Sequence, residues 1–224
     1  FDHSGLDALL RKFVKGDRVE YAALKADRAG LDAYVDRLAK LSKEEYDKLS
    51  REEQMALWIN AYNALTLRSI VDAYPIQAGI KLNTYPRNSI RQIDDVWEKK
   101  HPVAGRQISL NDIEHRILRP IWRDSRLHYA LNCAAIGCPN LQPWAFAGVG
   151  LDHAPDLAAM AYVENPRGMR LEDGELWVSS LYIWYIDDFG GDDRGVLDHL
   201  RKYAGPDLAR RLAGVNSLGG DGYD

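Results

Sequence analysis

The chain has few cysteines and no long apolar run. Of its 224 residues only Cys133 and Cys138 are cysteine, which is too few for a disulfide-based scaffold. No stretch approaches the roughly 18 consecutive apolar residues that predict a membrane-spanning helix. The formal net charge of −4 is spread along the chain without a block of like charges. We therefore expect neither a membrane span nor a nucleic-acid-binding surface.

Patterns typical of phosphate-binding loops and zinc sites are also missing. Gly190-Gly191 and Gly219-Gly220 are not placed between a predicted strand and a predicted helix, as a phosphate-binding loop requires. The sequence contains no His-Glu-x-x-His, and the two cysteines have four residues between them where zinc sites usually have two. We expect no cofactor and no metal site.

Hydrophobic residues make up 46 % of the chain, enough to bury a full core without disulfides or metals. The sequence starts at Phe1, as expected after removal of a secretory signal. This predicts a periplasmic or secreted protein, in a compartment where a disulfide is permitted.

Apolar spacing predicts helices in the first third of the chain. Leu6, Leu9, Leu10 and Phe13 recur at helical intervals, and a second amphipathic run covers about 27–39. Ser42 and Glu45 form a predicted capping box. A long helix is predicted over Arg51–Ala73, ended by Pro75.

The pattern changes from Ile90 onward. Two hairpins are predicted, over 96–110 and over 169–178, the second turning at Asp173-Gly174 as a type I′ turn. Ser109 should begin a helix that Pro120 ends, and His128–Cys133 should be a strand. Helices are expected over 156–163 and 196–212. We predict a single α+β domain over 1–216, with N-terminal helices followed by a small, mainly antiparallel sheet, and a loose tail over 217–224.

Two asparagines stand in the middle of the long predicted helix. Asn60 and Asn63 are poor interior helix residues because their amides compete for backbone hydrogen bonds. They can fix the backbone of a neighbouring loop. Alternatively, one of them can orient a catalytic imidazole or stabilise an oxyanion.

The stretch from His128 to Trp144 contains both cysteines. The turn residues 137–140 follow the predicted strand, so Cys133 should stand where regular structure ends, a common place for functional side chains. Three interpretations remain open: a Cys133–Cys138 disulfide, a reactive Cys133, or two inert buried thiols.

Four ordered motifs resemble the domain-of-unknown-function 547 family: Trp-Ile-Asn-Ala-Tyr-Asn-Ala at 58–64, Ser-Leu-Asn-Asp-Ile-Glu-His with Ile-Leu-Arg at 109–119, His-Tyr-Ala-Leu-Asn-Cys with Gly-Cys-Pro at 128–139, and Trp-Tyr with Asp-Asp-Phe at 184–189. The likeness runs from about residue 5 to residue 205. This resemblance indicates which positions belong to the family's motifs, but it implies no particular activity. Plant members carry serine in place of Cys138 and keep Cys133, which implies that a disulfide here is a local elaboration. Bacterial members often resemble exported proteins.

Cysteine catalysis needs a thiolate, an imidazole, a group that orients the imidazole, and donors for the oxyanion. Cys133 is the candidate nucleophile and His115, from a separate element, the candidate base. His128 should point away from Cys133 on a regular strand, because the two positions differ by an odd number. Glu114 is a further candidate site residue, but on a predicted helix it lies about 100° around from His115 and cannot easily orient that ring. Asn60, Asp187 or Asp188 can orient it instead.

These residues predict a papain-like or transglutaminase-like cysteine hydrolase or acyltransferase acting on a peptide or small amide. The alternative is an exported non-enzymatic binding or structural domain in which Cys133–Cys138 is a disulfide. The sequence does not determine the oligomeric state.

Overall fold

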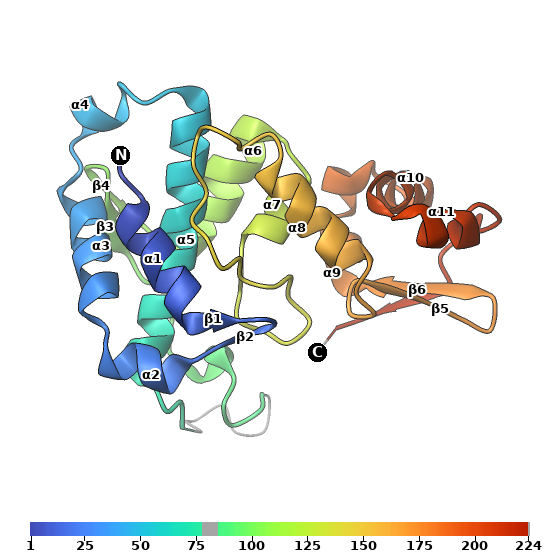
Figure 1. The fold of residues 1–224 in the computed structure, drawn as a ribbon, viewed down its shortest axis with the longest axis horizontal. Coiled ribbons are helices and arrows are strands. Elements are labelled where there is room, and N and C mark those ends of the chain that lie inside the picture. The colour runs from blue at the N-terminus through green and yellow to red at the C-terminus, as the bar shows by residue number, and fades with distance from the viewer. Residues whose placement is uncertain (78–84, 224) are drawn as a thin grey trace.

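The computed structural model describes residues 1–77 and 85–223. Figure 1 shows α1 to α6 gathered on one side and α8 to α11 with β5 and β6 on the other. Each side has its own large hydrophobic core; the first takes its residues from Leu6–Leu151 and the second from Ala158–Leu212, with Tyr129 added to the second. The predicted α+β class is confirmed.

The helices are α1 (Ser4–Phe13), α2 (Tyr21–Ala26), α3 (Ala29–Lys40), α4 (Lys43–Tyr46), α5 (Arg51–Ala73), α6 (Arg119–Trp122), α7 (Leu127–Ala130), α8 (Ala154–Val163), α9 (Ser180–Trp184), α10 (Asp193–Tyr203) and α11 (Pro206–Leu212). The strands are β1 (Val14–Lys15), β2 (Arg18–Val19), β3 (His101–Val103), β4 (Arg106–Ile108), β5 (Met169–Glu172), β6 (Glu175–Ser179) and β7 (Gly220–Gly222). Short 3₁₀ segments cover η1 (Ile90–Gln92) and η3 (Ile186–Phe189), and η2 (Asp112–Leu118) is a π-helix.

The long helix α5 has the bounds that the sequence predicts. Ser50 caps it, accepting from the Glu53 N–H while the Glu53 carboxylate accepts from the Ser50 N–H. Most of its middle is buried on every side, including Trp58 and both asparagines. The capping box at Ser42 and Glu45 is also confirmed.

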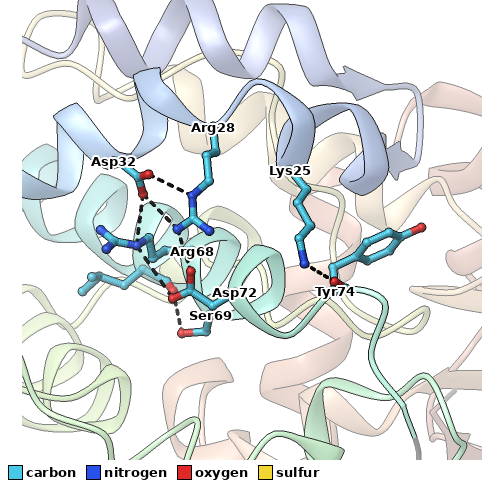
Figure 2. A network of polar contacts seen from close by, with 8 residues as sticks. Lys25, Arg28, Asp32, Arg68, Ser69, Asp72 and Tyr74 are labelled. Atoms are coloured by element: carbon cyan, nitrogen blue, oxygen red, sulfur yellow. Dashed lines mark hydrogen bonds and ion pairs between the residues drawn. The ribbon is translucent and has the colours of Figure 1, made fainter.

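The ionic contacts in Figure 2 join α3 to the end of α5. Arg28 bonds Asp32 at 2.8 Å and Asp72 at 2.6 Å, and Arg68 reaches Asp32 at 3.1 Å. Because these side chains are partly exposed, each pair contributes at most about 1 kcal/mol. Their main effect is to fix how the two helices pack.

In the described part of the chain the strands form three small sheets, where one was expected. Two are antiparallel hairpins, β1–β2 and β3–β4, and the third has the order β5–β6–β7. The β5–β6 hairpin turns at Asp173 (φ 50°) and Gly174 (φ 86°), which confirms the type I′ turn. Strand β7 pairs with β6 in parallel.

Three local predictions were wrong. His128–Cys133 is not a strand, because Leu127–Ala130 forms the short helix α7 and irregular backbone follows. Pro120 does not end a helix, since α6 continues to Trp122 and stops at Arg123 in the left-handed conformation. The tail is not loose, because β7 bonds to β6 through backbone groups; Asp224 lies outside the described residues.

Within the part of the chain that the structure describes, no helix is both long and apolar enough to cross a bilayer.

Candidate active site

A π-helix places two of the predicted site residues on one surface. Ser109 caps the short helical turn that leads into it: its hydroxyl accepts from the Asp112 N–H at 3.2 Å, and the Asp112 carboxylate accepts from the Ser109 N–H at 2.9 Å. The Arg119 N–H bonds the Glu114 carbonyl five residues back, which defines the wider turn. Glu114 Oε1 then lies 4.0 Å from His115 Nε2. The two side chains therefore approach each other although they are neighbours in the sequence.

His115 contacts an arginine from the next turn. The Arg119 Nη1 atom lies 3.0 Å from His115 Nδ1. A guanidinium can only donate, so Nδ1 accepts this bond and the ring proton of neutral His115 is on Nε2. The nitrogen that a general base needs is therefore already occupied.

His128, on α7, forms a pair with Asp188 from η3. His128 Nε2 lies 2.7 Å from Asp188 Oδ2, and Arg119 Nε donates to the same oxygen at 2.6 Å. Burial favours a raised pKa for Asp188, but the bonds from His128 and Arg119 outweigh it and hold the pKa well below its usual range. Asp188 is thus ionised, and His128 donates to it through Nε2–H. Nδ1 of His128 has no hydrogen-bond partner within residues 1–77 and 85–223.

Tyr185 joins this pair to Glu114. Its ring packs on His128 with centroids 4.0 Å apart, and its hydroxyl donates to Glu114 Oε1 at 2.8 Å. Burial, together with the charge of Glu114, raises the pKa of Tyr185 far above its ordinary value. The guanidinium carbon of Arg119 lies over the Tyr185 ring, 4.7 Å from its centre. The second, third and fourth sequence motifs therefore meet in one polar network.

The loop after α7 holds both thiols. Ala134 has φ 60°, and the side chain of Asn132 fixes the loop by accepting from the Ala134 N–H and donating to the Pro139 carbonyl. Cys133 Sγ lies 2.9 Å from Cys138 Sγ, and both cysteines are free thiols. The hydroxyl of Tyr223, carried in by β7, lies 3.3 Å from Cys133 Sγ.

The two thiols differ in acidity. The hydrogen bond between the two thiols lowers the pKa of Cys133, and although burial opposes this, bonds with Tyr223 and the Ala135 N–H act in the same direction. Cys138 is buried, and its hydrogen bond with Cys133 together with its burial raises its pKa. Cys133 is the more acidic and the more accessible thiol.

A cavity of about 540 Å³ brings together four of the five predicted site residues. Cys133, His115, Glu114 and His128 all line it. No hydrogen bond joins Cys133 to an imidazole in the described ranges, so the direct contact expected with His115 is not formed. His128, excluded by the strand prediction, shares the cavity with Cys133 because α7 and the following loop replace the strand.

Asn60 does not line this cavity. Its side chain donates to the Phe146 carbonyl at 2.7 Å and accepts from the Phe146 N–H at 2.9 Å, so it fixes a loop. These contacts support the loop-fixing interpretation, and the structure does not bring Asn60 to the other predicted site residues. Asn63 binds backbone on both sides of Leu131, donating to Ala130 O at 2.8 Å and accepting from Asn132 N at 2.9 Å. It supports the loop that carries Cys133.

Three residues of the site, Arg119, Tyr185 and Tyr223, were not predicted from the sequence. Arg119 and Tyr185 stand inside the recognised motifs, at 109–119 and 184–189, and the motifs were the only signal for them. Tyr223 lies in a glycine-rich tail that resembles a loose end. Asp188 was named as a residue able to orient a ring, but it binds His128 and not His115.

Among the described residues, no group of three or more His, Cys, Asp or Glu side chains is arranged to hold a metal ion.

Comparison with known proteins identifies the family. Searches of curated proteins and of solved structures find no match. A family model described as "Protein of unknown function, DUF547" matches residues 46–163, just over half of the chain. These residues include the first three motifs, with Cys133 and His128, and the fourth motif lies beyond them. The chain therefore belongs to the DUF547 family.

Proposed function

We propose that this protein is a cysteine-dependent hydrolase or acyltransferase acting on a peptide or small amide. The observation that supports it is the composition of one cavity, in which an acidified thiol at Cys133 shares the walls with His128, which is itself paired with Asp188. Cysteine, histidine and aspartate in these roles are a recurring set for acyl transfer.

Cys133 is the nucleophile in this proposal. Its thiolate attacks the carbonyl carbon of the substrate and forms a tetrahedral oxyanion. The N–H groups of the loop beside Cys133, including that of Ala135, are available to stabilise the negative oxygen. The C–N bond then breaks and leaves a thioester on Cys133.

His128 moves the protons. The thiol proton passes to Nδ1 of His128 and from there to the leaving amine, and His128 later takes a proton from the water or acceptor that attacks the thioester. Asp188 holds the ring through Nε2–H, and Arg119 holds Asp188. This requires Cys133 to exchange its contact with Tyr223 for one with His128 when substrate binds. Resting contacts of this kind commonly rearrange in the substrate complex.

An acyl-enzyme trap tests the proposal with a simple ester. We expect p-nitrophenyl acetate to release nitrophenol in a burst and to leave an acetyl group on Cys133, detected by mass spectrometry. His128→Ala should slow turnover about 100-fold or more, because it removes the proton carrier. The control is His153→Ala, since His153 is exposed outside the cavity. A burst that survives Cys133→Ala, or turnover unaffected by His128→Ala, contradicts the proposal.

A second candidate is a non-enzymatic binding or structural domain, exported to an oxidising compartment, with Cys133 and Cys138 oxidised. The 2.9 Å between the two sulfurs supports it, because bond formation needs little movement. Thiol counting on protein taken directly from its source separates the two. Two free thiols favour the enzyme, and no free thiol favours the disulfide.

A further inference from the structure

Residues 219–223 lead to the Cys133 sulfur, and part of this segment, β7, is bound as an added strand at the edge of β6. Gly219 N donates to Leu176 O at 2.8 Å, and Gly220–Gly222 runs parallel to β6 with Gly220 beside Trp177 and Gly222 beside Ser179. The strand contains two glycines and one aspartate, so backbone pairing provides most of its contacts. Addition of a strand to a sheet edge is a common mode of peptide recognition.

The pairing leaves room for a particular side-chain pattern. A Cβ added to Gly220 would lie 2.6 Å from the Trp177 ring, so this position admits only glycine unless the ring moves. Asp221 is fixed by the Ser180 hydroxyl, which donates to it at 2.5 Å. A Cβ added to Gly222 would meet nothing within 4 Å. The edge of β6 therefore selects for glycine at one position and tolerates other residues two positions later.

Tyr223 then enters the cavity. Its ring packs on Trp184 with centroids 4.7 Å apart, and its hydroxyl reaches Cys133. Trp184 is 59 % exposed and Ile136 is 71 % exposed, and both line the cavity. An apolar rim of this kind suits a ligand side chain, because exposed apolar surface gains free energy when it is covered.

We infer that the edge of β6 and the cavity at Cys133 form a binding site for an extended, glycine-containing peptide, and that residues 219–223 occupy this site as an intramolecular competitor. This inference rests on the proposed function, because it names the class of substrate that the same cavity binds. The peptide runs parallel to β6, presents glycine to Trp177 and places an aromatic residue between Trp184 and Cys133.

The test uses the full chain and the rate at which iodoacetamide labels Cys133. The pH is held above the ordinary thiol pKa of about 8.5, so that the rate reports access to the sulfur. Gly220→Val should displace the strand and raise the rate about 10-fold. Gly222→Val is the matched control, because its side chain meets free space, and it should label like the unaltered protein. Tyr223→Ala provides a second route to an open cavity if Gly220→Val folds poorly.

A peptide supplied separately completes the test. The peptide Ser-Leu-Gly-Gly-Asp-Gly-Tyr, which copies 217–223, should protect Cys133 in the Gly220→Val protein. The same peptide with valine in place of its second glycine should not. Equal labelling of all variants, or an opened cavity that the peptide fails to protect, overturns the inference. Neither readout needs turnover, so a protein that binds the peptide but forms no acetyl-enzyme refutes only the proposed function.

Discussion

Replacing Asn60 with alanine should destabilise the protein while leaving the chemistry of Cys133 intact. The side chain is 1 % exposed and satisfies both the N–H and the carbonyl of Phe146. Leaving one buried polar group without a partner costs about 1–3 kcal/mol. Because two groups lose their partner here, we expect Asn60→Ala to lower the free energy of unfolding by about 2–4 kcal/mol. For a chain of this size, in which 1 kcal/mol corresponds to about 2–4 °C, this is a fall in Tm of about 4–16 °C.

Denaturant and thermal unfolding measure this loss, and iodoacetamide labelling of Cys133 measures the chemistry. The control is Asn216→Ala, since Asn216 is exposed and makes only a 3.4 Å contact with the Gly214 carbonyl. It should change stability by less than about 0.5 kcal/mol. Unchanged stability in Asn60→Ala together with slower labelling of Cys133 refutes our assignment, because it places Asn60 in the site and not in the scaffold.

Three further predictions follow from individual contacts. Asn63→Ala should destabilise the protein to a similar extent and also change the labelling rate of Cys133, because Asn63 holds the Ala130 carbonyl and the Asn132 N–H beside that loop; a change in stability alone contradicts this. Ser50→Ala should lower the unfolding free energy by about 1 kcal/mol, measured by denaturant unfolding, because it removes the N-cap of α5. Burial lowers the pKa of His199 to about 4, so between that pH and about 6.5 the unfolded chain binds more protons and stability falls as the pH is lowered. His199→Gln, which cannot titrate, should flatten this slope in a series of unfolding curves, and an unchanged slope assigns the effect to other groups.

Features decided by local sequence were predictable. The capping boxes at Ser42 and Ser50 and the turn at Asp173-Gly174 depend on residues a few positions apart, and these elements form as the local pattern indicates. The amide partners of Asn60 were not predictable by position, because Phe146 is 86 residues away, but the need for some partner followed from a polar residue inside an apolar helix.

The site itself required tertiary information. All four residues of α7 are buried, so neither a period of 3.6 nor a period of 2 distinguishes this turn of helix from a strand. Because residues 127–130 form a helix, the argument that His128 and Cys133 point to opposite faces of a strand no longer applies. The π-helix at Asp112–Leu118 changes which neighbours share a face, and nothing in the apolar spacing indicates it.

The prediction of a loose tail over 217–224 was wrong for a different reason. Glycine-rich segments usually remain unpaired because they bury few side chains. Here the backbone of Gly220–Gly222 pairs with β6, and the missing Cβ at Gly220 is what allows close approach to Trp177. The high glycine content of this segment, which predicts a loose chain, is therefore equally compatible with a strand packed against the Trp177 ring.

The acidity of the Cys133 thiol tests the central claim most directly. The measurement is the rate of iodoacetamide labelling against pH in Cys138→Ser, which leaves one thiol and keeps a hydroxyl able to donate to it. Because hydrogen bonds from residue 138, Tyr223 and Ala135 stabilise the thiolate, we predict a midpoint clearly below the ordinary value of about 8.5. A midpoint at or above about 8.5 contradicts the account and favours the disulfide-bonded, non-enzymatic domain.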